Sequence, residues 1–468
     1  MKYEHYSESE YDWMPSLPSH WDVQRLKYVL NMHYGGCWGN DAAGDSNDRL
    51  CIRVADFDYD NIMVRSTAKT RRNYTDQQIE RGQLKKGDLI LEKSGGGEKT
   101  PVGRVVRFSN YDNQSVMFAN FSECLRPDSQ SINSDYLAFY LKAFYATSNM
   151  KRFYKQTTGI QNVDMSAYMR IGVPIPPAEE QEQIVNYLNW KLSSINKLVA
   201  IKHKEIRLLR ERREAEINEA VTHGVRKQSL KPSGLNWLPF IPEGWETIPA
   251  KVLFSHITEV RHQNDEMLAA TQKYGMIPQK KYMELEGRRI VLANDNLDKW
   301  IHVEPNDFVI SLRSFQGGLE LSTIPGCVTW HYVVLRPNEG VYVPYYRWLF
   351  KSASYIGALQ RTSDFIRDGQ DLRFSNFVKV RLMAIPLDEQ KQIADYLEQT
   401  IPKFDDMERK LQAQIELLQE MKDKIITDVV TGQEDVRDIV IPDCTYSIDS
   451  DDTDIDYEED IDENAEEE

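Results

Sequence analysis

The sequence predicts a mixed α/β protein with two similar domains. They are joined by two long helices that pair antiparallel as a coiled coil, and the chain has a pseudo-twofold internal repeat. Three observations carry this prediction. Motifs recur in the same order in both halves of the 468 residues, two long stretches share a heptad spacing, and these stretches carry opposite net charges. The length by itself favours two or three domains.

The clearest repeat opens each half of the chain. Two tryptophans and two prolines keep the same internal spacing at Trp13, Pro15, Pro18 and Trp21 and again at Trp237, Pro239, Pro242 and Trp245. Chance repetition of four such residues in step is improbable, so each half begins with a related unit. We expect the four tryptophans to pack in the core or at a domain edge rather than to stack on bases.

Further matches follow in the same order. A polar turn leads into an apolar strand at 86–91 and at 305–310, and a second strand ends in Leu-Arg-Pro at 125–127 and 335–337. An aromatic-rich helix is expected at 136–145 and at 345–355. Gln161 then aligns with Gln370, and the Glu-Gln-x-Gln-Ile-x-x-Tyr-Leu motif occurs at 180–188 and 389–397.

These repeats divide the chain into seven parts. The predicted parts are an N-terminal extension (1–12), a first domain (13–178), a first helical region (179–224), a linker (225–236), a second domain (237–387), a second helical region (388–432) and an acidic, disordered tail (433–468).

The helical regions carry the coiled-coil prediction. Pro402 suggests a short helix at 389–399 and a new long helix from Pro402, with a matching restart near Ser193 or Ser194, and Gly224 and Gly432 as stops. The apolar spacer residues are Ile195, Val199, Ile206 and Leu209 in the first helix and Phe404, Leu411, Ile415, Leu418 and Ile425 in the second; polar seam positions are Lys202, Arg213, Glu216, Glu408 and Lys422. Net charges of +2 over 193–223 and −2 over 402–431 favour pairing of the two helices with each other. The alternative is that each helix packs only on its own domain.

Charge and composition indicate a cytoplasmic protein without a large basic surface. The net charge is −16, but 14 of the 73 acidic residues lie in 443–468, where no basic residue occurs. The rest of the chain has 59 acidic and 57 basic residues, a net charge of −2, so any basic surface must be local. The five cysteines form no CxxC pair, which is typical of reduced thiols, and neither a signal peptide nor a long apolar run is present.

Catalytic signatures are lacking. The glycine-rich segment at 95–100 lacks the glycines of a phosphate-binding loop at the required positions, and the nine histidines show no zinc-binding spacing. Asp88, Glu92 and Lys93 lack the spacing of a nuclease triad. We therefore predict no catalytic residue and no metal site.

The repeated motifs resemble the specificity subunit of type I restriction-modification enzymes. The resemblance covers about residues 13–437. It rests on the Trp-x-Pro…Pro-x-x-Trp openings, on Pro174 to Gln181 and Ile385 to Gln390, and on the helix ends at 220–224 and 429–432. It implies two target recognition domains that read the halves of a bipartite, asymmetric DNA site, and helices that dock two methyltransferase subunits as well as motor and nuclease subunits. It also implies that the partner subunits bind S-adenosylmethionine, ATP and Mg²⁺ and that this chain is not an enzyme.

Two alternatives remain open. The chain could be the recognition subunit of a bifunctional type II restriction enzyme, which would have the same architecture. It could instead be a phage-exclusion or structural coiled-coil protein with no sequence-specific role on DNA.

Residues for DNA contact are predicted from basic clusters on loops, because phosphates attract Lys and Arg while base edges suit Arg, Lys, Gln and Ser. In the first domain they are Lys69, Arg71, Arg72 and Tyr74; Lys93, Ser94 and Lys99; and Lys151, Arg152, Lys155 and Gln156. In the second domain they are Arg288 and Arg289; Arg313, Ser314 and Gln316; and Arg361, Arg367 and Gln370.

Overall fold

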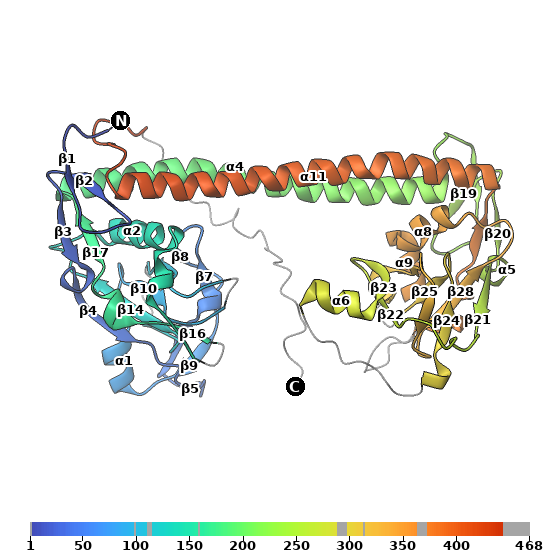
Figure 1. Cartoon of the computed structure of the whole chain (residues 1–468), viewed down its shortest axis with the longest axis horizontal. Coiled ribbons are helices and arrows are strands. Elements are labelled where there is room, and N and C mark those ends of the chain that lie inside the picture. The colour runs from blue at the N-terminus through green and yellow to red at the C-terminus, as the bar shows by residue number, and fades with distance from the viewer. Residues whose placement is uncertain are drawn as a thin grey trace. The chain divides into compact units, whose positions relative to one another are not determined.

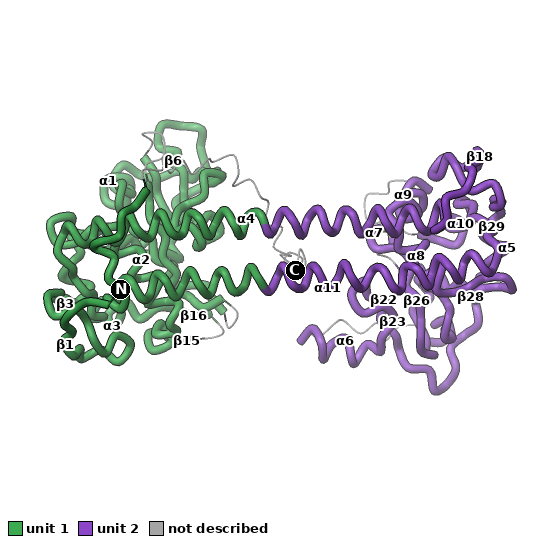
Figure 2. Tube along the Cα trace, turned by 90° about the horizontal axis from the view of Figure 1, so that it is seen from above, with its two compact units in different colours: residues 1–201, 414–468 green, residues 202–413 purple. Residues whose placement is uncertain are grey.

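The computed structural model describes residues 2–97, 100–109, 115–157, 160–287, 297–311, 314–362 and 372–442. The chain forms two compact units, coloured separately in Figure 2: unit 1 combines residues 1–201 with 414–468, and unit 2 comprises residues 202–413. Two long helices, α4 (Ala178–His223) and α11 (Leu387–Val430), each have one end in each unit. Each unit also contains one domain of helices and strands, so the predicted two-domain mixed α/β fold is confirmed.

The main sheet of unit 1 has six strands, and its inner strand β10 (Leu89–Glu92) is buried. Its order is β4 (Leu30–Gly35), β14 (Ser122–Pro127), β10, β12 (Val105–Arg107), β8 (Met63–Val64) and β7 (Phe57–Asp58). Strand β10 pairs antiparallel with both neighbours, and Leu89, Ile90 and Leu91 are fully buried. The predicted strands at 86–91 and 123–127 are thus confirmed as adjacent strands of one sheet.

Smaller sheets and short helices complete unit 1. They are the four-stranded sheet β13 (Val116–Phe118), β6 (Asp48–Ile52), β9 (Arg71–Asn73) and β5 (Asn40–Asp41); the three-stranded sheet β11 (Ser94–Gly96), β16 (Ile160–Val163) and β15 (Tyr154–Thr157); and the pairs β1 (Tyr6–Glu8) with β2 (Ser16–Pro18) and β3 (Asp22–Arg25) with β17 (Gly172–Ile175). The helices are α1 (Asp76–Gly82), α2 (Ser134–Ala146), α3 (Met165–Tyr168), η1 (Leu26–Tyr28), η2 (Val54–Asp56) and η3 (Asn149–Phe153).

Unit 2 repeats this plan with fewer paired strands among its described residues. Its largest sheet has the order β21 (Phe254–Ile257), β28 (Val333–Pro337), β25 (Phe308–Ile310) and β26 (Glu320–Leu321). The strand pairs are β18 (Leu230–Pro232) with β19 (Phe240–Pro242), β20 (Glu246–Ile248) with β29 (Leu382–Ala384), β22 (Leu268–Thr271) with β23 (Gly275–Pro278), and β24 (Ile301–Val303) with β27 (Gly326–Val328). The helices are α5 (Ala250–Leu253), α6 (Gln279–Glu286), η4 (Leu297–Lys299), α7 (Ser314–Gly317), α8 (Val343–Lys351), α9 (Ala353–Gln360) and α10 (Phe374–Phe377).

An equivalent ion pair between an arginine and a buried aspartate stabilises the main sheet of each unit. Arg126 donates to Asp88 through Nε and Nη2, each at 2.7 Å, and Arg336 donates to Asp307 through the same two nitrogens at 2.9 and 2.8 Å. Each aspartate follows a residue in the left-handed region, Gly87 (φ 89°) or Asn306 (φ 78°), a conformation that glycine and asparagine tolerate. The two polar turns aligned in the sequence therefore have the same geometry.

One aromatic helix differs from its prediction. In unit 1, α2 runs unbroken through the expected segment, whereas in unit 2 the chain divides at Ser352 into α8 and α9. The backbone of Ser352 is extended, and its hydroxyl accepts a hydrogen bond from the Tyr355 amide, which starts a second helix. The expected single helix at 345–355 is therefore wrong.

The two long helices are continuous, which corrects the predicted breaks near Ser193 and Pro402. Pro402 lies inside α11. Proline has no amide hydrogen, so the carbonyl of Glu398 loses its usual hydrogen-bond donor within the helix. Pro402 and Glu398 are both exposed, and water can donate to this carbonyl instead. Ile401 and Leu397 are buried at the same level, and this tertiary packing outweighs the local preference for a break.

Contacts within each unit establish that α4 and α11 run antiparallel. In unit 2, Arg210 contacts Glu408 at 2.7 Å and Arg213 contacts Asp405 at 3.1 Å, so the position on α11 falls as the position on α4 rises. In unit 1, Leu188 of α4 packs in one core cluster with Val429 of α11. Every predicted seam residue is buried or half-buried, although coiled-coil packing of these side chains stays a prediction.

Three hydrogen-bond contacts, each at least partly buried, attach each domain to the helices. The indoles of Trp21 and Trp245 donate to Glu180 and Glu389 at 3.1 and 2.7 Å. The side chains of Gln181 and Gln390 accept hydrogen bonds from the amides of Asn133 and Tyr342, just before α2 and α8. The hydroxyls of Tyr136 and Tyr345 donate to the carbonyls of Val430 and Val221, near the end of the opposite long helix. The core position expected for the tryptophans is confirmed for Trp21 and Trp245; Trp13 and Trp237 are half-buried.

The chain beyond α11 packs on unit 1, which corrects the predicted start of the tail. Val436 is fully buried, and Ile439 and Ile441 pack against the same core. Gln183 of α4 donates to the carbonyls of Val436 and Ile439 at 2.9 and 2.8 Å. The acidic segment 443–468 lies outside the described residues. Likewise, the expected N-terminal extension supplies β1, and the expected linker supplies β18.

Gly224 and Gly432 end the long helices as predicted, with φ of 81° and 68°. A Cβ added at Gly432 would lie 2.3 Å from Pro18 Cδ. A Cβ added at Gly224 would lie 3.5 Å from its nearest neighbour, Trp245 Cζ2. We expect Gly224→Ala to lower the free energy of unfolding by about 1 kcal/mol from the left-handed backbone alone. Gly432→Ala adds the steric clash and should cost about 2 to 4 kcal/mol. Urea denaturation compares the two variants, and equal losses would contradict this account.

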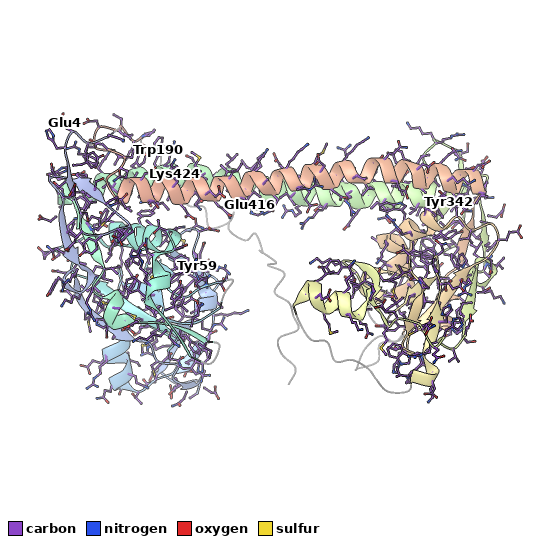
Figure 3. All side chains as sticks on the ribbon, viewed as in Figure 1. Glu4, Tyr59, Trp190, Tyr342, Glu416 and Lys424 are labelled. Atoms are coloured by element: carbon purple, nitrogen blue, oxygen red, sulfur yellow. The ribbon has the colours of Figure 1, made fainter. Side chains whose placement is uncertain are left out.

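A buried lysine joins α2 to the turn after β7 in unit 1. Lys142 Nζ donates to the carbonyl of Tyr59 at 2.9 Å (Figure 3 labels Tyr59) and to that of Asp60 at 3.2 Å. Burial, reinforced by the charge of Lys422, lowers the pKa of Lys142 to about 8. The folded state therefore releases this proton at lower pH than the unfolded chain does.

We expect this lysine to make unit 1 more stable in mild alkali. Between pH of about 8 and about 10.5 the unfolded chain binds the proton and the folded chain does not, so Lys142 contributes stability that rises with pH. The parent should gain unfolding free energy relative to Lys142→Met over this window. Denaturant titrations at several pH values measure the difference, with exposed Lys69→Met as the control. A pH-independent difference between parent and Lys142→Met would refute the assignment.

Candidate nucleic-acid interface

The first predicted basic cluster lies around β9, at the end of unit 1 away from α4 (Figure 1). The side chains of Lys69 and Arg71 are exposed, and among the described residues neither forms an ion pair. The Arg71 backbone pairs with Leu50, and its guanidinium makes one long contact to the Asp48 carbonyl at 3.4 Å. Both cations can therefore approach a phosphate without giving up a strong internal partner.

Arg72 and Tyr74 have internal roles instead. Tyr74 is 1% exposed and its hydroxyl donates to the Cys37 carbonyl at 3.1 Å, so the predicted contact of Tyr74 with DNA is wrong. Arg72 pairs with Asp41, lies 4.6 Å from the Trp38 ring and donates to the Trp38 carbonyl at 3.2 Å. Its donors hold the loop before β5, and its contact with DNA stays a prediction.

The three-stranded sheet brings two predicted segments together. Across its strands, Ser94 pairs with Asn162 and Asn162 pairs with Lys155, so the three side chains lie on one face. Ser94 Oγ donates to Asn162 Oδ1 at 2.6 Å, and Lys155 is exposed. A hydroxyl, an amide and an ammonium group in one row supply both donors and acceptors, which suits the edges of bases and the phosphates beside them.

Other members of these clusters have acidic neighbours. Lys155 contacts Asp164 at 2.7 Å and lowers the pKa of that carboxyl by this hydrogen bond. Lys93 contacts Glu123 at 2.9 Å, and Arg152 approaches Asp12 at 3.5 Å. Exposed pairs of this kind are weak and exchange readily for a phosphate, whereas Glu123 is largely buried, so Lys93 is held more firmly. Lys151 is exposed, Lys99 lies outside the described residues, and of Gln156 only the backbone position in β15 is described.

In unit 2 the predicted residues are only partly described. Gln316 and Arg361 are exposed. Ser314 is 1% exposed and its hydroxyl accepts the amide hydrogen of Ser311 at 2.8 Å, so this side chain is used internally and the predicted DNA contact is wrong. The remaining candidates, Arg288, Arg289, Arg313, Arg367 and Gln370, lie outside the described residues.

Sequence reasoning missed two features of these domains. Asn162 was not chosen, although it follows Gln161, one member of an aligned glutamine pair; the pairing of β16 with β11 and β15 is what gives it polar neighbours. In unit 2, His262, Asp265 and His302 come together with ligand atoms within 4.8 Å of one another. No short motif links His302 to the other two, so no local pattern indicated this group.

Residues 18–208 match the family model of the type I restriction modification DNA specificity domain. This segment is similar to a type I restriction-modification DNA specificity domain. The putative type I restriction enzyme MjaX specificity subunit of Methanocaldococcus jannaschii is 22% identical over 431 residues, which cover 89% of this chain and 94% of the relative. The MjaVIII specificity subunit of the same organism is 32% identical over 115 residues, 24% of this chain and 25% of the relative.

A solved structure of a type I restriction-modification system, described for its complex assembly and conformational transition, shares the fold. Its TM-score is 0.63 at 14% identity, and the match covers 88% of this chain and 98% of that one. The resemblance inferred from the repeated motifs is therefore confirmed. The matched family is described as a DNA specificity domain and the full-length relative as a specificity subunit, so the comparisons indicate DNA recognition. Among the described residues, no helix combines the length and apolarity needed to span a membrane.

The specificity domain in unit 1 yields a direct test. We expect Lys69→Ala with Arg71→Ala to weaken DNA binding and to flatten the slope of log K against log salt by about 2, because each lost phosphate contact removes about 0.9 from it. Binding titrations at several salt concentrations measure the slope. Arg25→Ala with Lys27→Ala, at the β3 side of unit 1, is a charge-matched control that should leave it unchanged. An unaltered slope in the first variant would exclude Lys69 and Arg71 from the interface.

Proposed function

We propose that this chain is the DNA-recognition subunit of a type I restriction-modification complex and that it reads a bipartite, asymmetric site. The observation that carries the proposal is the repeated framework of the two units, with the same ion pair and helix attachments but different loops. Because loops on a rigid scaffold carry binding residues, two domains with one framework and different loops can recognise two different DNA half-sites. Reading two short half-sites adds discrimination of about 1 to 3 kcal/mol per base pair.

The long helices would set the distance between the half-sites. A helix rises about 1.5 Å per residue, and α4 alone has 46 residues without a break. Helices of fixed length turn the spacing of two sites into specificity, as dimeric repressors do with their half-sites. The ion pairs between α4 and α11 in unit 2 support this role, because they fix the register of the two helices.

The same helices would dock the partner subunits. Large apolar side chains are exposed along them, where a helix with no further partner would carry polar residues: Leu198, Ile201 and Leu208 on α4, and Met407, Leu417 and Met421 on α11. Glu416 and Lys424, labelled on α11 in Figure 3, are exposed as well. We propose that two methyltransferase subunits bind here and that motor and nuclease subunits join them. S-adenosylmethionine, ATP and Mg²⁺ would act on those partners in the cytoplasm.

The first experiment compares adenine methylation of the host genome with and without this gene. We expect one split, non-palindromic motif to lose methylation when the gene is removed and to regain it when the gene is restored. Co-purification of a separate methyltransferase identifies a type I complex, whereas a fused methyltransferase and nuclease identifies the bifunctional type II alternative. An unchanged methylome would favour a phage-exclusion or structural role.

A matched deletion tests the role of the helices as a spacer. The contacts of Arg210 with Glu408 and Arg213 with Asp405 place residues 205–211 of α4 opposite residues 407–413 of α11, all within unit 2. Deleting both segments removes one heptad, about 10 Å, from each helix and keeps the seam aligned. We expect methylation of the same half-sites with a shorter spacer between them. Methylation at the original spacing would contradict the proposal.

A further inference from the structure

Two histidines and an aspartate converge in unit 2. His262 and Asp265 belong to the loop between β21 and β22, and His302 belongs to β24. His302 Nδ1 lies 2.7 Å from Asp265 Oδ2, and His262 Nδ1 lies 3.9 Å from Asp265 Oδ1. The centroids of the two imidazole rings are 3.9 Å apart. Both Nδ1 atoms therefore lie against one carboxylate.

The outer nitrogens of the same rings face two further carboxylates. His262 Nε2 contacts Glu259 Oε1 at 3.1 Å, and His302 Nε2 lies 3.6 Å from Glu304 Oε1. Histidines that bind metals commonly donate their second N–H to a carboxylate, which fixes the tautomer and orients the ring. This arrangement directs both Nδ1 atoms at Asp265. In the metal-bound form each ring would carry its proton on Nε2, and both Nδ1 lone pairs would face the cation.

The backbone holds this loop in place before any ligand binds. The Arg261 amide donates to the Trp300 carbonyl at 2.8 Å, and the His302 amide donates to the Glu259 carbonyl at 2.8 Å. The His262 amide also donates to Asp265 Oδ2 at 2.7 Å. His302 is 4% exposed, whereas the side chain of His262 is 55% exposed. The cluster thus has one buried, rigid ligand and one that can adjust from the solvent side.

We propose that His262, Asp265 and His302 bind one divalent transition-metal ion of the Zn²⁺ type. Two imidazoles and one carboxylate are the ligands that Zn²⁺ takes, and a water completes a tetrahedral site. At Zn–N distances of about 2.0 Å, tetrahedral ligand atoms lie about 3.3 Å apart. The present atoms lie within 4.8 Å of one another, so the exposed His262 would move inward, and His302 Nδ1, now 2.7 Å from Asp265 Oδ2, would move slightly away from it to admit the ion. The ion would fasten the loop between β21 and β22 to β24.

Metal titration of the full-length, untagged chain tests the site. After treatment with a chelator, the protein should bind one equivalent of Zn²⁺ by calorimetry. Co²⁺ in its place should produce the visible absorption of a tetrahedral nitrogen–oxygen site. Binding should also raise the thermal midpoint, since only the folded chain presents the three ligands together. Absence of saturable binding at one equivalent would overturn the proposal.

Three variants assign the ligands. His262→Ala, at an exposed position that can be changed without disturbing the core, should weaken Zn²⁺ affinity at least tenfold and abolish the Co²⁺ spectrum. Asp265→Asn keeps an acceptor for the His262 amide and should likewise lose the spectrum. His331→Ala, an exposed histidine of the same unit, should bind both ions as the parent does. Unchanged affinity and spectrum in His262→Ala would show that any bound metal lies elsewhere.

Discussion

A carboxylate in the first turn of each long helix holds the rest of this protein in place. Glu180 and Glu389 each accept a hydrogen bond from an indole of the domain opening, and the glutamine that follows each of them binds the backbone just before the aromatic helix. Charge near a helix N-terminus is stabilised by the helix dipole, so the anion strengthens both the helix and the attachment. One turn of helix thereby fixes the position of a whole domain.

A second attachment connects each domain to the other long helix. The hydroxyls of Tyr136 and Tyr345 are fully buried and reach carbonyls in the last turn of α11 and of α4. Those carbonyls lack intrahelical partners, so the tyrosines satisfy groups that would otherwise be buried without a hydrogen bond. Each domain therefore grips the beginning of one helix and the end of the other, which requires the antiparallel arrangement found within each unit.

Basic side chains in this framework differ in their partners from those at the predicted DNA-binding surface. Arg126 and Arg336 each form a bidentate ion pair with a buried aspartate, while Lys69 and Arg71 remain open to solvent. Sequence composition alone cannot separate these two classes, because both are basic residues next to strands. Arg72 illustrates the difficulty: one position from Arg71, its side chain pairs with the exposed Asp41 and lies over the Trp38 ring, since neighbouring residues of a strand face opposite sides.

The sequence by itself determined the repeat, the main strands, the helix stops and the family resemblance, because these depend on local patterns that recur at matching positions. Tertiary structure decided the rest. Packing of Ile401 kept α11 helical through Pro402, and burial removed Tyr74 and Ser314 from the interface. Strand pairing gathered Ser94, Asn162 and Lys155, and loop folding gathered His262 with His302. These outcomes depend on contacts between residues distant in the chain, whose free energies exceed the local preferences from which a sequence is interpreted.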